Sequence, residues 1–214
     1  MSHDDYQIEP VEGLPERPPA GEEILWQGRP DWWRLAWESM SLPWVIGYFA
    51  ILALWRFGSV VDILPLGQAI GATVPLIVLG AVVVGLLTLT AYVQARSAVY
   101  TVTNRRVAMR IGAALTMTLN LPYTQIANAM LDLRRGGTGT IAFETMGETR
   151  LGYLTCWPHL RPWHMRPTQP ALRCIPDAER VAGLIADAAR SRISEPKLSR
   201  KTPAGRVGSA VAAE

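Results

Sequence analysis

The chain carries no charged residue between Asp62 and Arg96, and this apolar stretch constrains its fold more than any other feature. Within the stretch, residues 70–93 are mainly Val, Leu, Ile, Ala and Gly. A helix needs about 20 such residues to cross the hydrocarbon core of a membrane. The sequence therefore predicts a transmembrane helix at this place.

A second and shorter apolar run, residues 39–55, precedes it. Its length is at the short end of the range for a transmembrane helix, and Trp37, Trp44 and Trp55 are suited to hold its ends at the two membrane interfaces. A re-entrant or buried core helix is the alternative. We favour a second span, because a single neighbouring span would leave this Trp-rich run with nothing to bury it. The two runs together predict a transmembrane hairpin.

Arginines beside the two runs predict the orientation of the hairpin. They lie outside both runs, whereas the connecting loop, residues 57–69, contains none. The positive-inside rule then places both termini in the cytoplasm and the loop in the periplasm of an inner-membrane, multi-pass protein. The flanking arginines are Arg29, Arg34, Arg96, Arg105, Arg106 and Arg110.

The segment before the hairpin has two parts. Residues 1–28 are acidic and polar, lack the features of a signal peptide, and are expected to be largely disordered. Residues 29–96 then comprise an interfacial helix and the two spans. In the sequence PDWWRLAWESM, residues Trp33, Ala36, Trp37 and Met40 follow helical spacing, which predicts an amphipathic helix on the membrane surface. An extension of the first span is the alternative.

The part of the chain after the hairpin reads as strands. Residues 115–121, LTMTLNL, alternate with a period of two, as in a strand with one buried face. Residues 151–156 are another expected strand, and residues 176–190 have the start signals and apolar spacing of a helix. Residues 97–190 therefore predict an antiparallel β-barrel or sandwich capped by a C-terminal helix, and the whole chain an α+β membrane protein. The basic tail, residues 191–214, is expected to be disordered.

Two stretches carry a resemblance to known proteins. YTVTNRRVAMRIG, residues 100–112, resembles the hairpin of bacterial PH-like membrane domains, in which segments like GEEILWQGRP also precede a two-helix hairpin. The stretch from LGYLTCWPHLRPWHMRPTQP to residue 188 is similar to the C-terminal half of PuhB-type photosynthetic-complex assembly proteins. The resemblance covers roughly residues 10–190.

This resemblance implies a pleckstrin-homology-like (PH-like) fold for residues 97–190. It also implies a non-enzymatic assembly factor for the reaction centre, and for the core antenna, in the cytoplasmic or intracytoplasmic photosynthetic membrane of a purple bacterium. The implied partners are reaction-centre subunits, with the H subunit a candidate, and other assembly factors. A second copy of the chain is a further candidate.

The predicted partner-binding residues lie in one proline-rich stretch. Trp and Arg are the residue types that most often dominate interfaces, and the stretch contains Trp157, His159, Arg161, Trp163 and His164. A structural loop packed on the barrel rim is the plainer interpretation. We favour it over a third one, in which His159 or His164 ligates the magnesium of a bacteriochlorophyll. No other cofactor is expected. No metal site is expected either, because no acidic residue or cysteine joins the histidines at metal spacing.

Asn104, Arg105 and Arg106 are predicted at the tip of the first hairpin. The hairpin begins a few residues after the second span, so we expect its tip to contact anionic lipid headgroups; two solvated turn residues are an equal alternative. The sequence shows no catalytic motif, which predicts no enzyme and no catalytic residue. The pI of about 9.1 is explained by the tail and the flanks, so no nucleic-acid partner is expected.

A second function class stays open beside the assembly factor. It is a general PH-like membrane protein that binds anionic lipid or stabilises another membrane system. Gene neighbourhood discriminates the two classes, since adjacency to the gene of the reaction-centre H subunit favours assembly.

Overall fold

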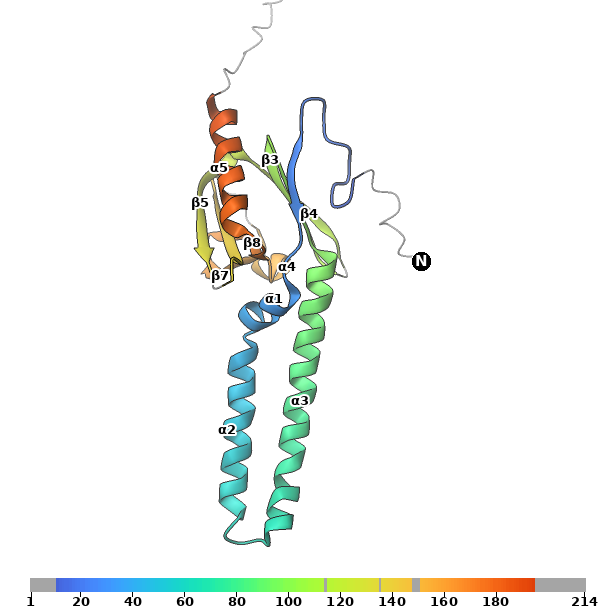
Figure 1. Cartoon of the computed structure of the whole chain (residues 1–214), viewed down its shortest axis with the longest axis vertical. Coiled ribbons are helices and arrows are strands. Elements are labelled where there is room, and N and C mark those ends of the chain that lie inside the picture. Colours follow the sequence, from blue (N-terminus) through green and yellow to red (C-terminus); the bar gives the residue numbers. More distant parts are fainter. Residues whose placement is uncertain (1–10, 114, 135, 148–150, 195–214) are drawn as a thin grey trace, which may run out of the picture.

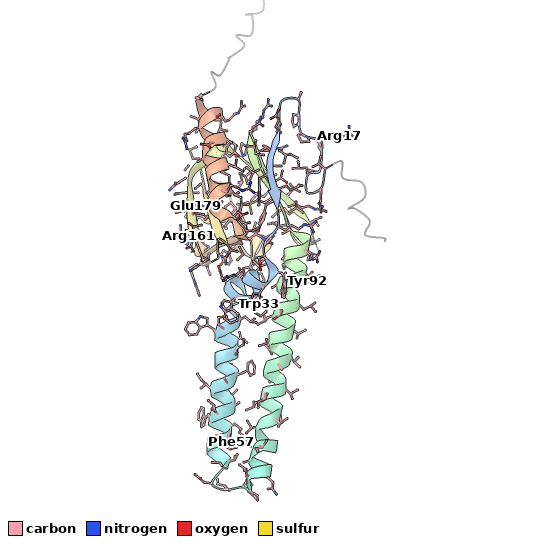
Figure 2. All side chains as sticks on the ribbon, in the orientation of Figure 1. Arg17, Trp33, Phe57, Tyr92, Arg161 and Glu179 are labelled. Atoms are coloured by element: carbon pink, nitrogen blue, oxygen red, sulfur yellow. The ribbon has the colours of Figure 1, made fainter. Side chains whose placement is uncertain are left out.

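The computed structural model describes residues 11–113, 115–134, 136–147 and 151–194. It has a β-rich domain at one end and two long helices that extend from it side by side (Figure 1). These helices are α2 (Leu42–Val60) and α3 (Leu66–Ser97). Both are long and apolar enough to cross a membrane by length and composition. Side chains project outwards along the whole helical pair. Phe57 marks the end that is remote from the sheets, and Tyr92 marks the end close to the sheets (Figure 2).

The first sheet is built from both sides of this helical pair. Its four antiparallel strands are ordered β1 (Ile24–Gly28), β2 (Val99–Thr103), β3 (Arg106–Ile111) and β4 (Met117–Pro122). Strand β1 pairs with β2, with Gly28 opposite Tyr100, so α2 and α3 interrupt the sheet between its first two strands. The start of α2 and the end of α3, which we call the outer ends of the helical pair, are therefore both attached to the same domain.

Strand β1 corrects one expectation from the sequence. Residues 24–28 belong to the segment expected to be disordered, but their backbone groups pair with β2. Much of β1 is exposed at the edge of the sheet, which explains why the sequence shows no alternating pattern there. Residues 1–10 of the same segment lie outside the described residues.

The second sheet has the order β5 (Ile126–Leu133), β6 (Gly139–Thr145), β8 (Thr168–Ile175) and β7 (Leu160–Met165). A 3-10 turn, η1 (Tyr123–Gln125), connects the two sheets, which do not close into a barrel. Helix α5 (Ala178–Ser194) packs on η1, β5 and β6. The shared core includes Tyr100, Met109, Phe143, Leu172, Val181 and Ile185. Antiparallel sheets covered by a C-terminal helix agree with the expected α+β fold.

Two further boundaries differ from expectation. Residues 151–156, expected as a strand, contain the short helix α4 (Tyr153–Cys156), because the Cys156 N–H donates to the Gly152 carbonyl four residues earlier. Helix α5 continues to Ser194 rather than ending at residue 190. The predicted tail from residue 195 to 214 lies outside the described residues.

Helix α1 (Trp32–Ser39) connects the helical pair to the second sheet. The Asp31 carboxylate accepts a hydrogen bond from the Arg34 N–H at 2.9 Å, which caps the helix. Leu35 is buried against Ala95 of α3 and Cys174 of β8. Ser41, in the left-handed conformation with φ of 54°, separates α1 from α2, so α1 is not an extension of the first long helix.

Candidate functional site

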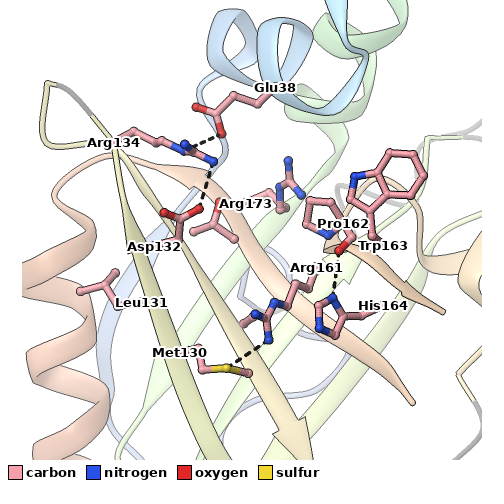
Figure 3. A pocket seen from close by; sticks show the side chains of 12 residues that line it. Glu38, Met130, Leu131, Asp132, Arg134, Arg161, Pro162, Trp163, His164 and Arg173 are labelled. Atoms are coloured by element: carbon pink, nitrogen blue, oxygen red, sulfur yellow. Dashed lines mark hydrogen bonds and ion pairs between the residues drawn. The ribbon is translucent and has the colours of Figure 1, made fainter. Parts of the chain in front are cut away.

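A cleft of about 420 Å³ lies beside α1, on the face of the second sheet opposite the core (Figure 3). Ile141 and Phe143 of β6 point into the core, whereas Thr140 and Ala142 between them line the cleft, as strand alternation requires. A second hollow of about 220 Å³ is also lined by Glu38, Pro162, Trp163 and Arg173. The remaining lining of the first cleft is Met130, Leu131, Asp132, Arg134, Arg161 and His164.

Four of the five predicted partner-binding residues line these two hollows. Trp163 is 89% exposed and Trp157 is 38% exposed, and both line the smaller hollow. The Arg161 guanidinium donates to the Gln169 Oε1 atom at 3.0 Å and reaches the Met130 sulfur at 3.1 Å. The sequence therefore identified a set of residues that the fold gathers around one region.

His159, the fifth residue, is not at this surface. It is 1% exposed, and its Nδ1 atom lies 2.6 Å from the Tyr100 hydroxyl. Burial, with the nearby charge of Arg173, lowers the pKa of His159 to about 3, so the ring is neutral at physiological pH. The expectation of a partner contact or a surface pigment ligand at His159 is therefore wrong, because its side chain turns into the core.

Arg173 is the residue at this site that the sequence analysis missed. It is 4% exposed, donating from one terminal nitrogen to the Leu160 carbonyl at 3.0 Å and from the other to the Ser39 hydroxyl at 2.7 Å. Its Nε atom is buried without a hydrogen-bond partner. A charged residue inside the apolar strand sequence ALRCI was the one signal that pointed to it.

Glu38 brings negative charge to the same region. Its carboxylate lies 3.7 Å from the Nε atom of Arg134. The Cys174 thiol lies 3.8 Å from Glu38. Burial and then the Glu38 charge raise the pKa of Cys174 to about 12, so this thiol stays protonated.

The predicted lipid-contact residues lie elsewhere. Asn104 accepts from the Glu23 N–H and donates to the Gly21 carbonyl, and the Arg106 Nε atom lies 2.9 Å from the Glu22 carboxylate. Together with Arg105 they form the β2–β3 tip, which shares a hollow with Leu184 and Asp187 of α5. This tip follows the end of β2 that is remote from α3, away from the two long helices (Figure 1).

The strand geometry explains this placement. Strand β2 leaves the end of α3 and rises about 3.3 Å per residue, which carries the tip well beyond a Debye length of about 8 Å. The expectation that a short linker keeps Asn104, Arg105 and Arg106 beside the headgroups is therefore wrong for a membrane crossed by α2 and α3.

Comparison with known proteins gives one family and one full-length relative. The sequence matches the model of the bacterial PH domain family over residues 43–189, which is more than half of the chain. It is 44% identical over 207 residues to an uncharacterized 23.7 kDa protein in the puhA 5′ region of Rhodobacter capsulatus. That alignment spans 96% of this chain and 97% of the relative. No solved structure matches the sequence.

Proposed function

The chain belongs to the bacterial PH domain family, and from this premise we propose that it is a non-enzymatic membrane protein that helps to assemble the photosynthetic reaction centre of a purple bacterium. The observation that carries the proposal is the relative from Rhodobacter capsulatus, which aligns over nearly its whole length and lies beside the photosynthesis gene puhA. The core antenna is a second candidate for the same assembly role.

The proposed location is the inner membrane, including its intracytoplasmic photosynthetic part. Helices α2 and α3 have the length and composition of membrane spans. The pairing of β1 with β2 ties both outer ends of the helical pair to one domain, which supports a domain on a single side of the membrane. The arginines outside the two apolar runs favour the cytoplasmic side.

The proposed docking surface for reaction-centre subunits is the exposed part of the two hollows. Trp157 and Trp163 lie there with the exposed apolar side chain of Met165, and with Arg161 at the larger cleft. Exposed apolar groups gathered in one region are typical of interaction surfaces, and buried Trp and Arg anchors often dominate binding energy. The H subunit is the candidate partner that the sequence resemblance implies.

The test replaces both Trp157 and Trp163 with Ala in a photosynthetic purple bacterium that makes this protein. We expect lower accumulation of reaction centres, measured by their absorbance in isolated membranes, while the variant protein stays in the membrane fraction. Trp55→Ala is the matched control, because it removes an exposed Trp from α2, far from the domain. Normal accumulation in the double variant would exclude this surface as the docking site.

A strain that lacks the protein separates the proposal from its alternative. Selective loss of reaction centres supports an assembly factor. An equal loss of unrelated membrane complexes supports the general membrane protein instead.

A further inference from the structure

Arg173 is a buried cation whose partners are all neutral. Its guanidinium donates to the Leu160 carbonyl and the Ser39 hydroxyl, and its Nε atom has no partner. His159 beside it is neutral and adds no second positive charge. Burying an unpaired charge is costly, and buried N–H groups in proteins are rarely left without an acceptor. An anion is therefore the missing partner that the chemistry of this position favours.

The charges that face the cleft leave room for such an anion. Its two carboxylates, on Glu38 and Asp132, both lie near Arg134, at 3.7 Å and 3.0 Å. Among the described residues, no carboxylate comes within ion-pair distance of Arg161 or Arg173. Figure 3 shows Arg134 with its two acidic partners on one side and Arg161 and His164 on the other, with Arg173 between them. The cleft therefore has two arginines available for a negative ligand.

The shape of the cleft suits an amphipathic anion. Its volume of about 420 Å³ lies within the usual range for small-molecule sites. Part of its lining is apolar and comes from Met130, Leu131 and Ala142, and the charged part includes Arg161 and Arg173. A guanidinium presents a planar fork of N–H donors that matches phosphate oxygens. A phosphate ester with an apolar body fits this combination.

The position of the cleft points to the source of that ligand. Helix α1, which carries Glu38 to the cleft and Ser39 to the smaller hollow, lies where the domain meets α2 and α3 (Figure 1). Trp32, Trp33 and Trp37 of this helix are exposed, and Trp is enriched at the interface between membrane and water. We therefore propose that this cleft binds the phosphate of an anionic lipid headgroup, with Arg161 and Arg173 as its ligands. The proposal depends on the membrane position of α2 and α3 and is independent of the assembly role.

The test uses the full-length protein, solubilised in detergent with equal amounts of phosphatidylglycerol and phosphatidylcholine, and counts bound lipids by native mass spectrometry. We expect the wild type to retain phosphatidylglycerol in preference to phosphatidylcholine. Arg161→Gln should lower this preference about fivefold. Arg161 is half-buried and is not part of the hydrophobic core, so this substitution tests the proposal without removing a core side chain. Arg173→Gln should lower the preference further. A cooperative unfolding transition should first show that this variant is folded.

Arg105→Gln is the matched control, since it removes an arginine from the opposite end of the domain. It should leave the preference unchanged. Equal retention of the two lipids by the wild type, or an unchanged preference in Arg161→Gln, would overturn the proposal. Displacement of phosphatidylglycerol by soluble glycerol 1-phosphate would show that the cleft takes a soluble phosphate ester rather than a lipid, and would overturn the proposal. Loss of lipid binding with normal reaction-centre accumulation would separate this site from the docking surface.

Discussion

The Tyr100 hydroxyl lies 2.6 Å from the Nδ1 atom of His159, and this hydrogen bond joins the first sheet to the segment that leads into the second. The same hydroxyl accepts a hydrogen bond from the backbone N–H of Arg173 at 3.3 Å. The Tyr100 and His159 rings meet edge to face, with their centroids 5.7 Å apart and an angle of 82° between the ring planes. Three residues far apart in the sequence thus share one buried polar contact between the sheets.

Removing the Tyr100 hydroxyl should destabilise the domain. In Tyr100→Phe the buried Nδ1 atom of His159 and the N–H of Arg173 lose a partner, which costs about 1–3 kcal/mol of unfolding free energy. Denaturant unfolding of the full-length protein, followed by tryptophan fluorescence, measures this loss. Tyr48→Phe, at an exposed position of α2, is the control and should change little. An unchanged midpoint in Tyr100→Phe would show that the contact adds nothing to stability.

The stability of the domain should fall as the pH is lowered through the range set by His159. Its pKa is about 3 in the folded protein and about 6.5 when unfolded, so between these values the unfolded chain binds a proton that the folded chain does not. Stability is therefore highest above pH 6.5 and is lost by up to about 1.4 kcal/mol per pH unit below it. Denaturant unfolding between pH 7 and pH 4 measures the slope.

His159→Gln should flatten this pH dependence, because the titrating group is gone. His164→Gln is the control and should keep the wild-type slope, since His164 lies at the cleft rather than in the core. Equal slopes in all three proteins would contradict the assignment to His159.

A methyl group at Gly112 should destabilise the β3–β4 turn strongly. Gly112 has a φ of 98°, and a Cβ atom there would lie 2.0 Å from the backbone oxygen of Leu115. We expect Gly112→Ala to lower the unfolding free energy by about 2–4 kcal/mol. Gly137→Ala is the matched control, because its φ of 77° is also positive but no atom lies within 4 Å of the new carbon. It should cost only about 1–2 kcal/mol, and equal losses would rule out the backbone collision.

Two new cysteines should be labelled from opposite sides of the membrane. Both native thiols, Cys156 and Cys174, are buried, and burial raises their pKa, so they should react slowly with maleimides. Ile63, between α2 and α3, and Leu154, in α4, are exposed. In intact spheroplasts an impermeant maleimide should label Ile63→Cys and spare Leu154→Cys, and inverted vesicles should give the reverse. Labelling of both from one side would contradict a hairpin that spans the membrane.

Local sequence patterns predicted those parts of the fold that depend on neighbouring residues. The uncharged run after Asp62 gave the long helix α3, and the alternation in LTMTLNL gave most of β4, because one face of that strand packs on the core. The position of β1 was not predictable in this way. Its partner lies far along the chain, as the hydrogen bond between Glu23 and Asn104, 81 residues apart, illustrates.

The candidate site shows the same division. The proline-rich stretch indicated that Trp157, Arg161 and Trp163 lie in one region, because they are close in sequence. The burial of His159 and Arg173 depends on Tyr100 and Ser39, which come from other parts of the chain. No local pattern distinguishes such a buried polar residue from one at the surface.

The pairing of β1 with β2 also determines the order of events when the ribosome makes this chain. Strand β1 emerges first and has no partner until β2 follows it, after the whole of α2 and α3. The first sheet can therefore be completed only once both apolar helices have been synthesised and have brought their ends back together. A chain whose helical pair does not form therefore leaves β1 without β2, and such an unpaired strand edge favours association with other chains.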